Sequence, residues 1–200
     1  MADDTSTKPL YFWKETDGKT GYLSQWYYCP FRDDVDPEKI YDTAEHYMMH
    51  QKALLFKDEA IAAEILTVKY HPRKIKALGR AVQNFSDETW VANREAIVVR
   101  GNMLKFTNAV TEEGFRMGSS DSKKTASELP LLQGSLKDVL LSTGERELVE
   151  ASPRDRIWGV GFGATNAGGN RGRWGLNLLG KALMEVRKTL REQDAENEAE

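Results

Sequence analysis

The sequence has one cysteine, no long apolar run and almost no net charge, and each shortage excludes a class of protein. Cys29 is the single cysteine among 200 residues, so an internal disulfide framework and a CxxC metal ribbon are excluded. No stretch of about 18 apolar residues occurs. The start MADDTSTKP also lacks the basic and then apolar order of a secretory signal. We therefore expect an intracellular protein, cytoplasmic or nuclear, with no membrane partner.

The balance of basic and acidic residues limits the classes of molecule that this protein can bind. The chain holds 28 basic and 31 acidic residues, which gives a formal net charge of −3, and the pI is about 5.8. A protein with this balance does not attract long duplex nucleic acid through its net charge. Small molecules and single-stranded nucleic acid remain as partner classes, and a local basic site is compatible with the total.

Composition along the chain predicts one domain with unstructured ends. Hydrophobic residues make up 40% of the chain, which is enough for one core at this length. Residues 1–9 are polar and residues 192–200 are acidic without apolar partners, so both ends are predicted to be disordered. Residues 111–128 are rich in Gly, Ser, Lys and Asp, which predicts a flexible insertion. The domain is therefore predicted to cover residues 10–191.

Periodicity and capping signals predict a mainly helical fold. Residues 10–26 contain two aromatic stretches around Asp17-Gly18, which favours a hairpin or a pair of short strands. Apolar residues elsewhere recur every three or four positions, with Thr43 as an N-cap and Pro72 at a helix start. The predicted helices cover residues 44–57, 58–68, 72–82, 86–106, 136–141 and 176–190, and 148–149 is predicted as a strand. The fold class is therefore α+β, a mainly helical single domain with a few short strands.

The segment TAEHYMMHQKA places Glu45 in the first turn of a predicted helix. Unpaired N–H groups and the helix dipole favour an ionised carboxylate there. Such a group can stabilise a cationic ribosyl carbon or activate a water against it; the alternative is that Glu45 only caps the helix. His46 and His50 have the spacing of a metal pair, but no HExxH pattern or third ligand accompanies them. We therefore predict no metal, and packing or a hydrogen bond for His46.

Residues 158–175, WGVGFGATNAGGNRGRWG, form a glycine-rich stretch that suits close backbone approach to a phosphate or ribose. The stretch has neither a Walker pattern nor a dinucleotide fingerprint, and an ordinary structural loop is the alternative. Arg171 and Arg173 are candidate phosphate ligands, with solvated arginines as the alternative. Trp90 and Trp158 are candidates for stacking on a base, with core packing as the alternative.

Several separated segments resemble one family. They are YFW at 11–13, GYLSQW at 21–26, YDTAEHYMMHQKALLF at 41–56, ALGR at 77–80, LLSTGERELVEASPRDRIWGVGFG at 140–163 and NRGRWGLNLLGKALMEVR at 170–187. In this order they cover nearly all of the chain between residues 10 and 190. The sequence resembles the NADAR or YbiA-like proteins, in particular their fungal and oomycete-type members, and the resemblance implies a YbiA-like fold.

The resemblance also implies roles for individual residues. The TAEH match makes Glu45 the catalytic acidic residue of the family type, with His46 as its neighbour in the same pocket. Trp90 matches the family's tryptophan on the long helix. Asn177 and Gly180 match the N-x-L-G helix start.

A second motif carries both matches and departures. Asp155, Trp158 and Gly159 match the family's D-x-x-W-G segment. Val160 stands where bacterial riboflavin-linked members often have an acid, and Leu176 stands where many members have lysine. The lack of an acid at position 160 weakens the assignment of a riboflavin-pathway substrate. It does not affect the role that the resemblance implies for Glu45.

The family is understood to consist of N-glycosidases that cleave C1′–N bonds of ribose-phosphate-type substrates. The resemblance therefore implies a cofactor-independent and metal-independent hydrolase that removes ADP-ribose from a guanine base or nucleoside, free or linked to nucleic acid. In this interpretation Glu45 and Asp155 are catalytic. Glu45 acts on the ribosyl carbon, and Asp155 assists the leaving base. The predicted substrate-binding residues are His46, Trp90, Trp158, Gly159, Arg171, Arg173 and Asn177.

Three alternatives accompany this prediction. The first is hydrolysis of a riboflavin-pathway ribosylaminopyrimidine phosphate, which Val160 disfavours. The second is a module that binds ADP-ribose or another NAD derivative without turnover. The third is a structural interaction protein that uses the acidic tail, which would leave the glycine-rich stretch without a role.

Overall fold

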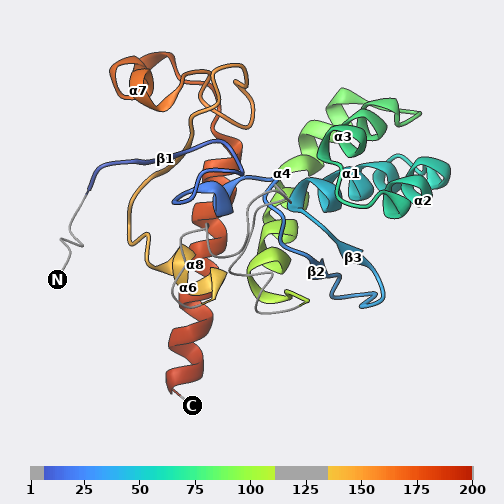
Figure 1. Cartoon of the computed structure of the whole chain (residues 1–200), viewed down its shortest axis with the longest axis horizontal. Coiled ribbons are helices and arrows are strands. Elements are labelled where there is room, and N and C mark those ends of the chain that lie inside the picture. The colour runs from blue at the N-terminus through green and yellow to red at the C-terminus, as the bar shows by residue number, and fades with distance from the viewer. Residues whose placement is uncertain (1–6, 111–134, 200) are drawn as a thin grey trace.

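The computed structural model describes residues 7–110 and 135–199 of the chain, and helices dominate this part (Figure 1). The α-helices are α1 (Ala44–Leu55), α2 (Glu59–Thr67), α3 (Pro72–Ala81), α4 (Asp87–Thr107), α6 (Leu136–Leu141), α7 (Ala164–Ala167) and α8 (Leu178–Ala199). Two 3-10 helices are η1 (Gly21–Leu23) and η3 (Gly168–Arg173). The strands are β1 (Leu10–Phe12), β2 (Phe31–Arg32), β3 (Ile40–Tyr41) and β4 (Leu148–Glu150). The predicted mainly helical α+β class is confirmed.

Polar side chains start the helices close to where the sequence predicts. The N-caps of α1, α2, α4 and α6 are Thr43, Asp58, Ser86 and Ser135, and each side chain accepts a backbone N–H three residues on. These hydrogen bonds satisfy donors that a helix leaves unpaired at its first turn. The bounds of α6 coincide with the predicted residues 136–141.

The strands form two pairs, and the predicted N-terminal hairpin is wrong. β1 pairs in parallel with β4, with Leu10 opposite Leu148 and Phe12 opposite Glu150. β2 pairs with β3 in antiparallel orientation. Asp17 does close a turn, because its Oδ1 accepts the N–H groups of two following residues, but η1 comes after the turn where a second strand was expected. The backbone of β1 is satisfied instead by a strand from the far end of the sequence.

The core lies where α4 and α8 pack against each other. On one side α1 crosses α4 and carries α2 and α3, while on the other side β4, which pairs with β1, packs against α8 (Figure 1). Leu183, Val186 and Leu190 of α8 are fully buried in this core, as their three-four spacing predicts. Residues of α1 and of β4 are thereby held on either side of one cleft.

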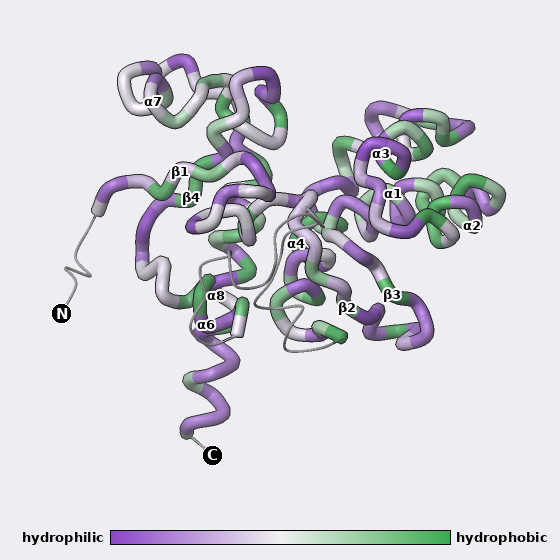
Figure 2. Tube along the Cα trace, in the orientation of Figure 1, coloured by the Kyte–Doolittle hydropathy of each residue, from purple (hydrophilic) through white to green (hydrophobic). Residues whose placement is uncertain are grey.

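The last turns of α8 correct a second prediction. Residues 192–199 are helical, so the expected disorder of residues 192–200 is wrong for this segment. Ion pairs support the helix there: Lys188 with Glu192 at 3.7 Å, and Lys137 of α6 with Asp194. Figure 2 shows this end as hydrophilic. No helix in the described part of the chain, α8 included, is long and apolar enough to cross a membrane.

Two predicted segments cannot be compared with the fold. Residues 7–9 contain no helix or strand, and residues 1–6 lie outside the described residues. The predicted insertion at 111–128 also lies outside them.

Candidate active site

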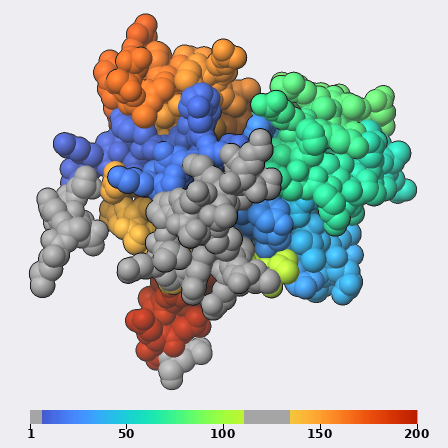
Figure 3. All heavy atoms as spheres, in the orientation of Figure 1, coloured from blue at the N-terminus to red at the C-terminus, as the bar shows by residue number. Residues whose placement is uncertain are grey.

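A cleft of about 750 Å³ lies where three separate segments meet. The first segment follows β1, the second consists of α1 and α3, and the third runs from the end of β4 into the glycine-rich stretch. In Figure 3 the blue N-terminal segment lies between helices α1–α3, coloured from blue-green to green, and the orange residues around 150–175. The lining residues are Trp13, Lys14, Glu15, Thr16, Ser24, Gln25, Trp26, Glu45, Met48, Arg73, Lys76, Ala77, Arg80, Glu150, Ser152, Arg154, Asp155 and Trp158.

Glu45 lies in this cleft in the first turn of α1, as the sequence predicts. Its backbone N–H donates to the carbonyl of Gln25 at 2.9 Å, so the helix start is fixed to the segment after η1. The side chain is 4% exposed, and its Oε1 is buried with no hydrogen-bond partner among the described residues. A buried acceptor without a partner is costly, which indicates that substrate or water completes this site.

Burial raises the pKa of Glu45, while Lys76 and the indole N–H of Trp26 favour its ionised form. Asp155 opposes ionisation and Arg80 supports it more weakly. The Lys76 ammonium also lies over the Trp26 ring, 5.7 Å from the centroid. Glu45 is therefore a desolvated carboxyl with a nearby cation and a donor arranged to stabilise its charge.

Glu150 is a second buried carboxyl in the cleft, and the sequence analysis missed it. The residue ends β4, and its Oε2 is buried with no partner among the described residues. Burial and, after it, the charges of Asp155 and Glu45 together raise the pKa of Glu150 to about 8, with Lys76 opposing. An acid directly after a predicted strand is a weak signal. Only the fold brings it near Glu45.

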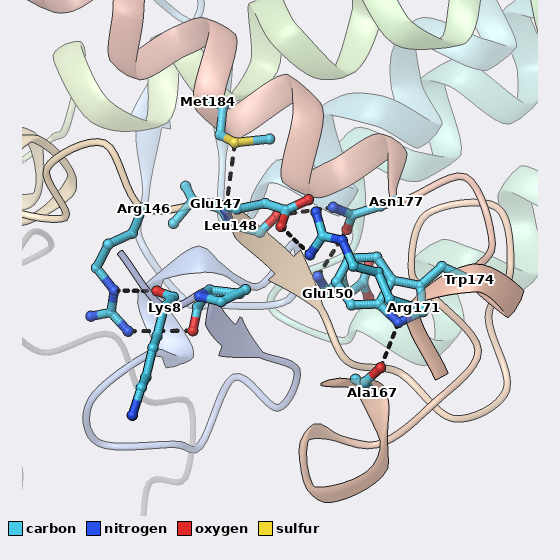
Figure 4. A network of polar contacts seen from close by, with 11 residues as sticks. Lys8, Arg146, Glu147, Leu148, Glu150, Ala167, Arg171, Trp174, Asn177 and Met184 are labelled. Carbon is cyan, nitrogen blue, oxygen red and sulfur yellow. Dashed lines mark hydrogen bonds and ion pairs between the residues drawn. The ribbon is translucent and has the colours of Figure 1, made fainter. Parts of the chain in front are cut away.

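Asn177, which precedes α8, positions Glu150. Its Nδ2 donates to the carbonyl of Leu148 at 2.9 Å, and its Oδ1 accepts the N–H of Glu150 at 3.0 Å (Figure 4). Asn177 has a φ of 52°, a left-handed conformation that asparagine tolerates better than most residues. Asn177 was predicted to bind substrate, and the structure places it behind β4, where it holds the strand.

Gly159 has no side chain, which allows the glycine-rich stretch to pack closely against β4. A Cβ on Gly159 would lie 2.7 Å from the carbonyl oxygen of Glu150 and 3.2 Å from that of Asp155. Such distances leave no room for a side chain. Gly159 therefore permits close packing behind the cleft, and it is not among the residues that line it.

Asp155 and Trp158, two of the predicted site residues, both line the cleft. Oδ1 of Asp155 accepts the N–H groups of Ile157 and Trp158, each at 2.8 Å. This arrangement is an Asx turn, in which the carboxylate closes the loop on its own backbone. Asp155 thus holds the loop that presents the Trp158 ring, and it also places a negative charge near Glu45 and Glu150.

Three cations on α3 face the cleft, and the sequence analysis did not select them. Arg73, Lys76 and Arg80 recur at intervals of three and four residues, so they share one side of the helix. Ile75 and Gly79 are buried on the other side. The signal was present in the sequence as a basic stripe opposite an apolar one. These groups give a positive lining in a protein of net negative charge.

His46 does not enter the cleft. Its Nδ1 accepts the N–H of Asp42 at 3.3 Å and its Nε2 lies 3.0 Å from the carbonyl oxygen of Ile65. Both ring nitrogens are thereby occupied, and burial lowers the pKa of His46. His50 contacts the hydroxyl of Tyr41 through Nδ1 at 3.0 Å. The two histidines therefore tie α1 to its neighbours, in agreement with the packing alternative.

Trp90, Arg171 and Arg173 also lie away from the cleft. Trp90 packs against the core, with Lys52 above its ring. Arg171 donates to Glu147 at 2.7 Å and stacks on Trp174 (Figure 4). Arg173 hydrogen-bonds to Asn170 and lies above the ring of Phe162. The arginines of the glycine-rich stretch thus hold that stretch together, and the cations at the cleft come from α3, Lys14 and Arg154.

A buried polar chain supports the floor of the cleft. Lys105 is fully buried, and its ammonium donates to the carbonyls of Tyr22 at 2.6 Å and Ser24 at 3.0 Å. Asn102 donates to Oε1 of Gln25 at 3.0 Å, and Nε2 of Gln25 is buried without a partner among the described residues. α4 therefore fixes the segment that carries the carbonyl partner of the Glu45 amide.

The comparisons with known proteins agree with this architecture. The family model of the NADAR domain matches residues 11–191. An N-glycosidase of Acanthamoeba polyphaga mimivirus is 38% identical over 170 residues, which cover 83% of this chain and 85% of that protein. An N-glycosidase of Nostoc punctiforme is 32% identical over 149 residues, which cover 74% of each chain. The NMR structure of YbiA from Escherichia coli matches with a TM-score of 0.63 and 25% identity, over 95% of this chain and 89% of YbiA.

These matches confirm part of what the resemblance implied. The prediction of the family and of a YbiA-like fold is confirmed. The relatives are N-glycosidases, which confirms at the level of enzyme class the prediction of a hydrolase that acts on N-glycosyl bonds. On this sequence match and this fold, the chain belongs to the NADAR domain family.

Proposed function

We propose that this protein hydrolyses the bond between C1′ of ribose and a nitrogen of guanine, and so removes ADP-ribose from an ADP-ribosylated guanine base or nucleoside. The observation that carries the proposal is Glu45, a buried carboxyl with an unpartnered oxygen in a cleft that also holds aromatic rings and cations. Placement in the fungal and oomycete-type part of the family belongs to the same proposal.

Glu45 acts on the ribosyl carbon. Cleavage of a glycosidic C–N bond leaves positive charge on C1′, and a nearby carboxylate stabilises that charge and accepts a proton from the attacking water. Burial raises the pKa of Glu45, and Lys76 and Trp26 oppose this effect by favouring the ionised form. Since Glu45 is buried, the interaction between the carboxylate and the cationic carbon is stronger than it would be in solution.

The cations hold the phosphates of the substrate. Arg73, Arg80 and Arg154 line the cleft, and guanidinium groups bind phosphate oxygens through paired N–H donors. The volume of about 750 Å³ lies within the range of cofactor-sized sites. A pyrophosphate substrate therefore fits the charge and the size of the cleft, with its diphosphate toward α3.

Aromatic side chains suit the base. Trp158 and Trp26 are half-buried in the lining, and Trp13 is 43% exposed at the same cleft. Planar bases stack on such rings without the need for a specific hydrogen-bond pattern. The cleft is open to solvent at Trp13. This opening accommodates guanine in a free nucleoside or in a single strand.

A riboflavin-pathway substrate is the second candidate. Val160 is fully buried in a small cluster with Val149 and Ala167, so this position gives the cleft no additional carboxylate. Binding of ADP-ribose without turnover is the candidate of another class, and it predicts a rise in melting temperature with ADP-ribose but no product.

The test compares wild type with Glu45→Gln on three substrates: an oligonucleotide with ADP-ribosylated guanine, ADP-ribosylated guanosine, and a ribosylaminopyrimidine phosphate. Mass spectrometry follows release of the sugar phosphate. Glu147→Gln is the matched control, because it makes the same change in a carboxylate that pairs with Arg171 outside the cleft. We expect wild type and Glu147→Gln to release ADP-ribose from the guanine substrates, with a loss of about 1,000-fold in Glu45→Gln.

Other outcomes overturn the proposal in distinct ways. Release from the ribosylaminopyrimidine alone would assign the riboflavin-type activity. No release from any substrate, with ADP-ribose still raising the melting temperature, would assign a binding module. Full activity in Glu45→Gln would remove the catalytic role of Glu45.

A further inference from the structure

We propose that Glu150 is a second catalytic residue, the acid that protonates the guanine nitrogen as it leaves, and that Asn177 positions it. This inference rests on the N-glycosidase function proposed above and assigns the proton donor of that reaction. It replaces Asp155 in the role that the sequence analysis gave to that residue.

The geometry places Glu150 and Glu45 in one cleft. Glu45 comes from the start of α1 and Glu150 from the end of β4, and both line the same cavity. Each carboxyl has one buried oxygen that lacks a hydrogen-bond partner among the described residues. Two unpartnered carboxyl oxygens in a cavity provide the two functions of glycosidic cleavage, one at the ribosyl carbon and one at the leaving group.

The surroundings distinguish the two carboxyls. Indole N–H donation from Trp26 favours ionisation at Glu45, and no donor within the described part of the chain acts on Glu150 in this way. Three charged groups act on Glu150: Asp155 from the loop after β4, Glu45 from α1 and Lys76 from α3. The other charged residues that line the cleft are Lys14, Glu15, Arg73, Arg80 and Arg154. Burial and the two carboxylates hold the pKa of Glu150 at about 8, so it carries a proton at neutral pH.

The hydrogen bonds of Asp155 assign it a different role. Both N–H groups that reach its Oδ1 belong to the loop it closes, at 2.8 Å each. An acceptor used in this way fixes the backbone of its own loop. Asp155 therefore contributes its charge and the placement of Trp158, and Glu150 contributes the proton.

The reaction balances with these two groups. A C1′–O bond forms between the ribosyl carbon and water, while Glu45 takes a proton from that water. The C1′–N bond breaks, its electron pair stays on the guanine nitrogen, and that nitrogen takes the proton of Glu150. The products are ADP-ribose and an unmodified guanine. Solvent then returns the proton from Glu45 to Glu150, so the cycle consumes one water and no other reactant.

The experiment measures kcat and KM from pH 5 to pH 9.5 on ADP-ribosylated guanosine, for wild type, Glu150→Gln, Glu150→Asp and the control Glu147→Gln. For wild type we expect kcat to fall as pH rises through about 8. In Glu150→Gln we expect kcat at pH 7 to fall by about 100-fold or more, with KM within about 3-fold and no alkaline decline. Glu150→Asp retains a carboxyl, so we expect it to be more active than Glu150→Gln and to show the decline of kcat at alkaline pH.

A merely structural role for Glu150 would give a different pattern. Circular dichroism and melting temperature show whether each variant is folded, and Glu150→Asp tests the carboxyl if Glu150→Gln does not fold. Activity within 3-fold of wild type in a folded Glu150→Gln, or an alkaline decline that persists in it, would overturn this inference and leave the proposed function intact. Inactive wild type would overturn the proposed function itself.

Discussion

The side chain of Asn177 accepts the backbone N–H of Glu150 at 3.0 Å, and this bond joins the start of α8 to the strand that ends in the cleft. The same amide donates to Leu148 at 2.9 Å, so it pairs with the free edge of β4 as another strand would. Gly180 completes the contact, since a Cβ there would lie 2.1 Å from the carbonyl oxygen of Leu148. The position of Glu150 thus depends on α8, which lies behind the cleft.

We expect Asn177→Gly to lower both stability and turnover. Glycine retains the left-handed backbone at this position, so the change removes mainly the two side-chain hydrogen bonds. The free energy of unfolding should fall by about 1–3 kcal/mol, and kcat should fall by more than KM rises. Urea unfolding and steady-state kinetics measure both. Asn166→Ala, in the exposed α7, is the control, and equal kcat values in the two variants would contradict the positioning role.

Removal of one α3 cation should weaken substrate binding. Arg73→Gln deletes a guanidinium that lines the cleft, and loss of one charge-assisted hydrogen bond to phosphate corresponds to a rise in KM of about 10-fold. The adjacent Lys74→Gln is the control, because Lys74 pairs with Glu64 at 3.7 Å away from the cleft. Kinetics at low and high salt should show a smaller salt dependence in Arg73→Gln. A KM for Arg73→Gln that equals that of Lys74→Gln would refute a phosphate site at α3.

The protonation of Glu150 makes stability depend on pH. The ordinary pKa of a glutamate is 4.5, and in the fold that of Glu150 is about 8. Between these values the folded chain keeps the proton and the unfolded chain releases it. The stabilisation is therefore complete below about pH 4.5 and is lost as pH approaches 8, with a slope of up to about 1.4 kcal/mol per pH unit.

Glu150→Gln removes this dependence, because its amide does not titrate. Urea unfolding of both proteins at pH 5, 6, 7 and 8 should show that the stability of wild type relative to the variant declines as pH rises. A constant difference across this range would mean that Glu150 is ionised in the folded protein.

Gly159→Ala should disturb the wall behind the cleft. The added methyl would lie 2.7 Å from the carbonyl oxygen of Glu150, and overpacking of this kind costs about 1–3 kcal/mol. Gly169→Ala is the control, since a Cβ at that position meets nothing within 4 Å. Thermal unfolding should show a clear loss for Gly159→Ala and almost none for Gly169→Ala. Equal melting temperatures would contradict the close packing of this loop on β4.

The capped helices and the position of Glu45 follow from local sequence. Thr43 begins α1 through a hydrogen bond to a residue three positions on, and this bond places Glu45 in the first turn wherever the helix lies in the fold. Asp58, Ser86 and Ser135 act in the same way on their helices. Such contacts involve neighbours in sequence, so residue type and spacing are enough to predict them.

The composition of the cleft depends on contacts between distant segments. Glu150 lines it because β4 pairs with β1 and because Asn177 holds the end of that strand. His46 follows Glu45 directly in sequence, yet it turns to Ile65 on α2. Arg171 has the residue type of a phosphate ligand, but Glu147 and Trp174 occupy its guanidinium. The sequence by itself determined the helices and Glu45, because these depend on bonds within one turn of chain. Only the tertiary structure decided which other charges share the cleft, because that depends on which distant segments pack together.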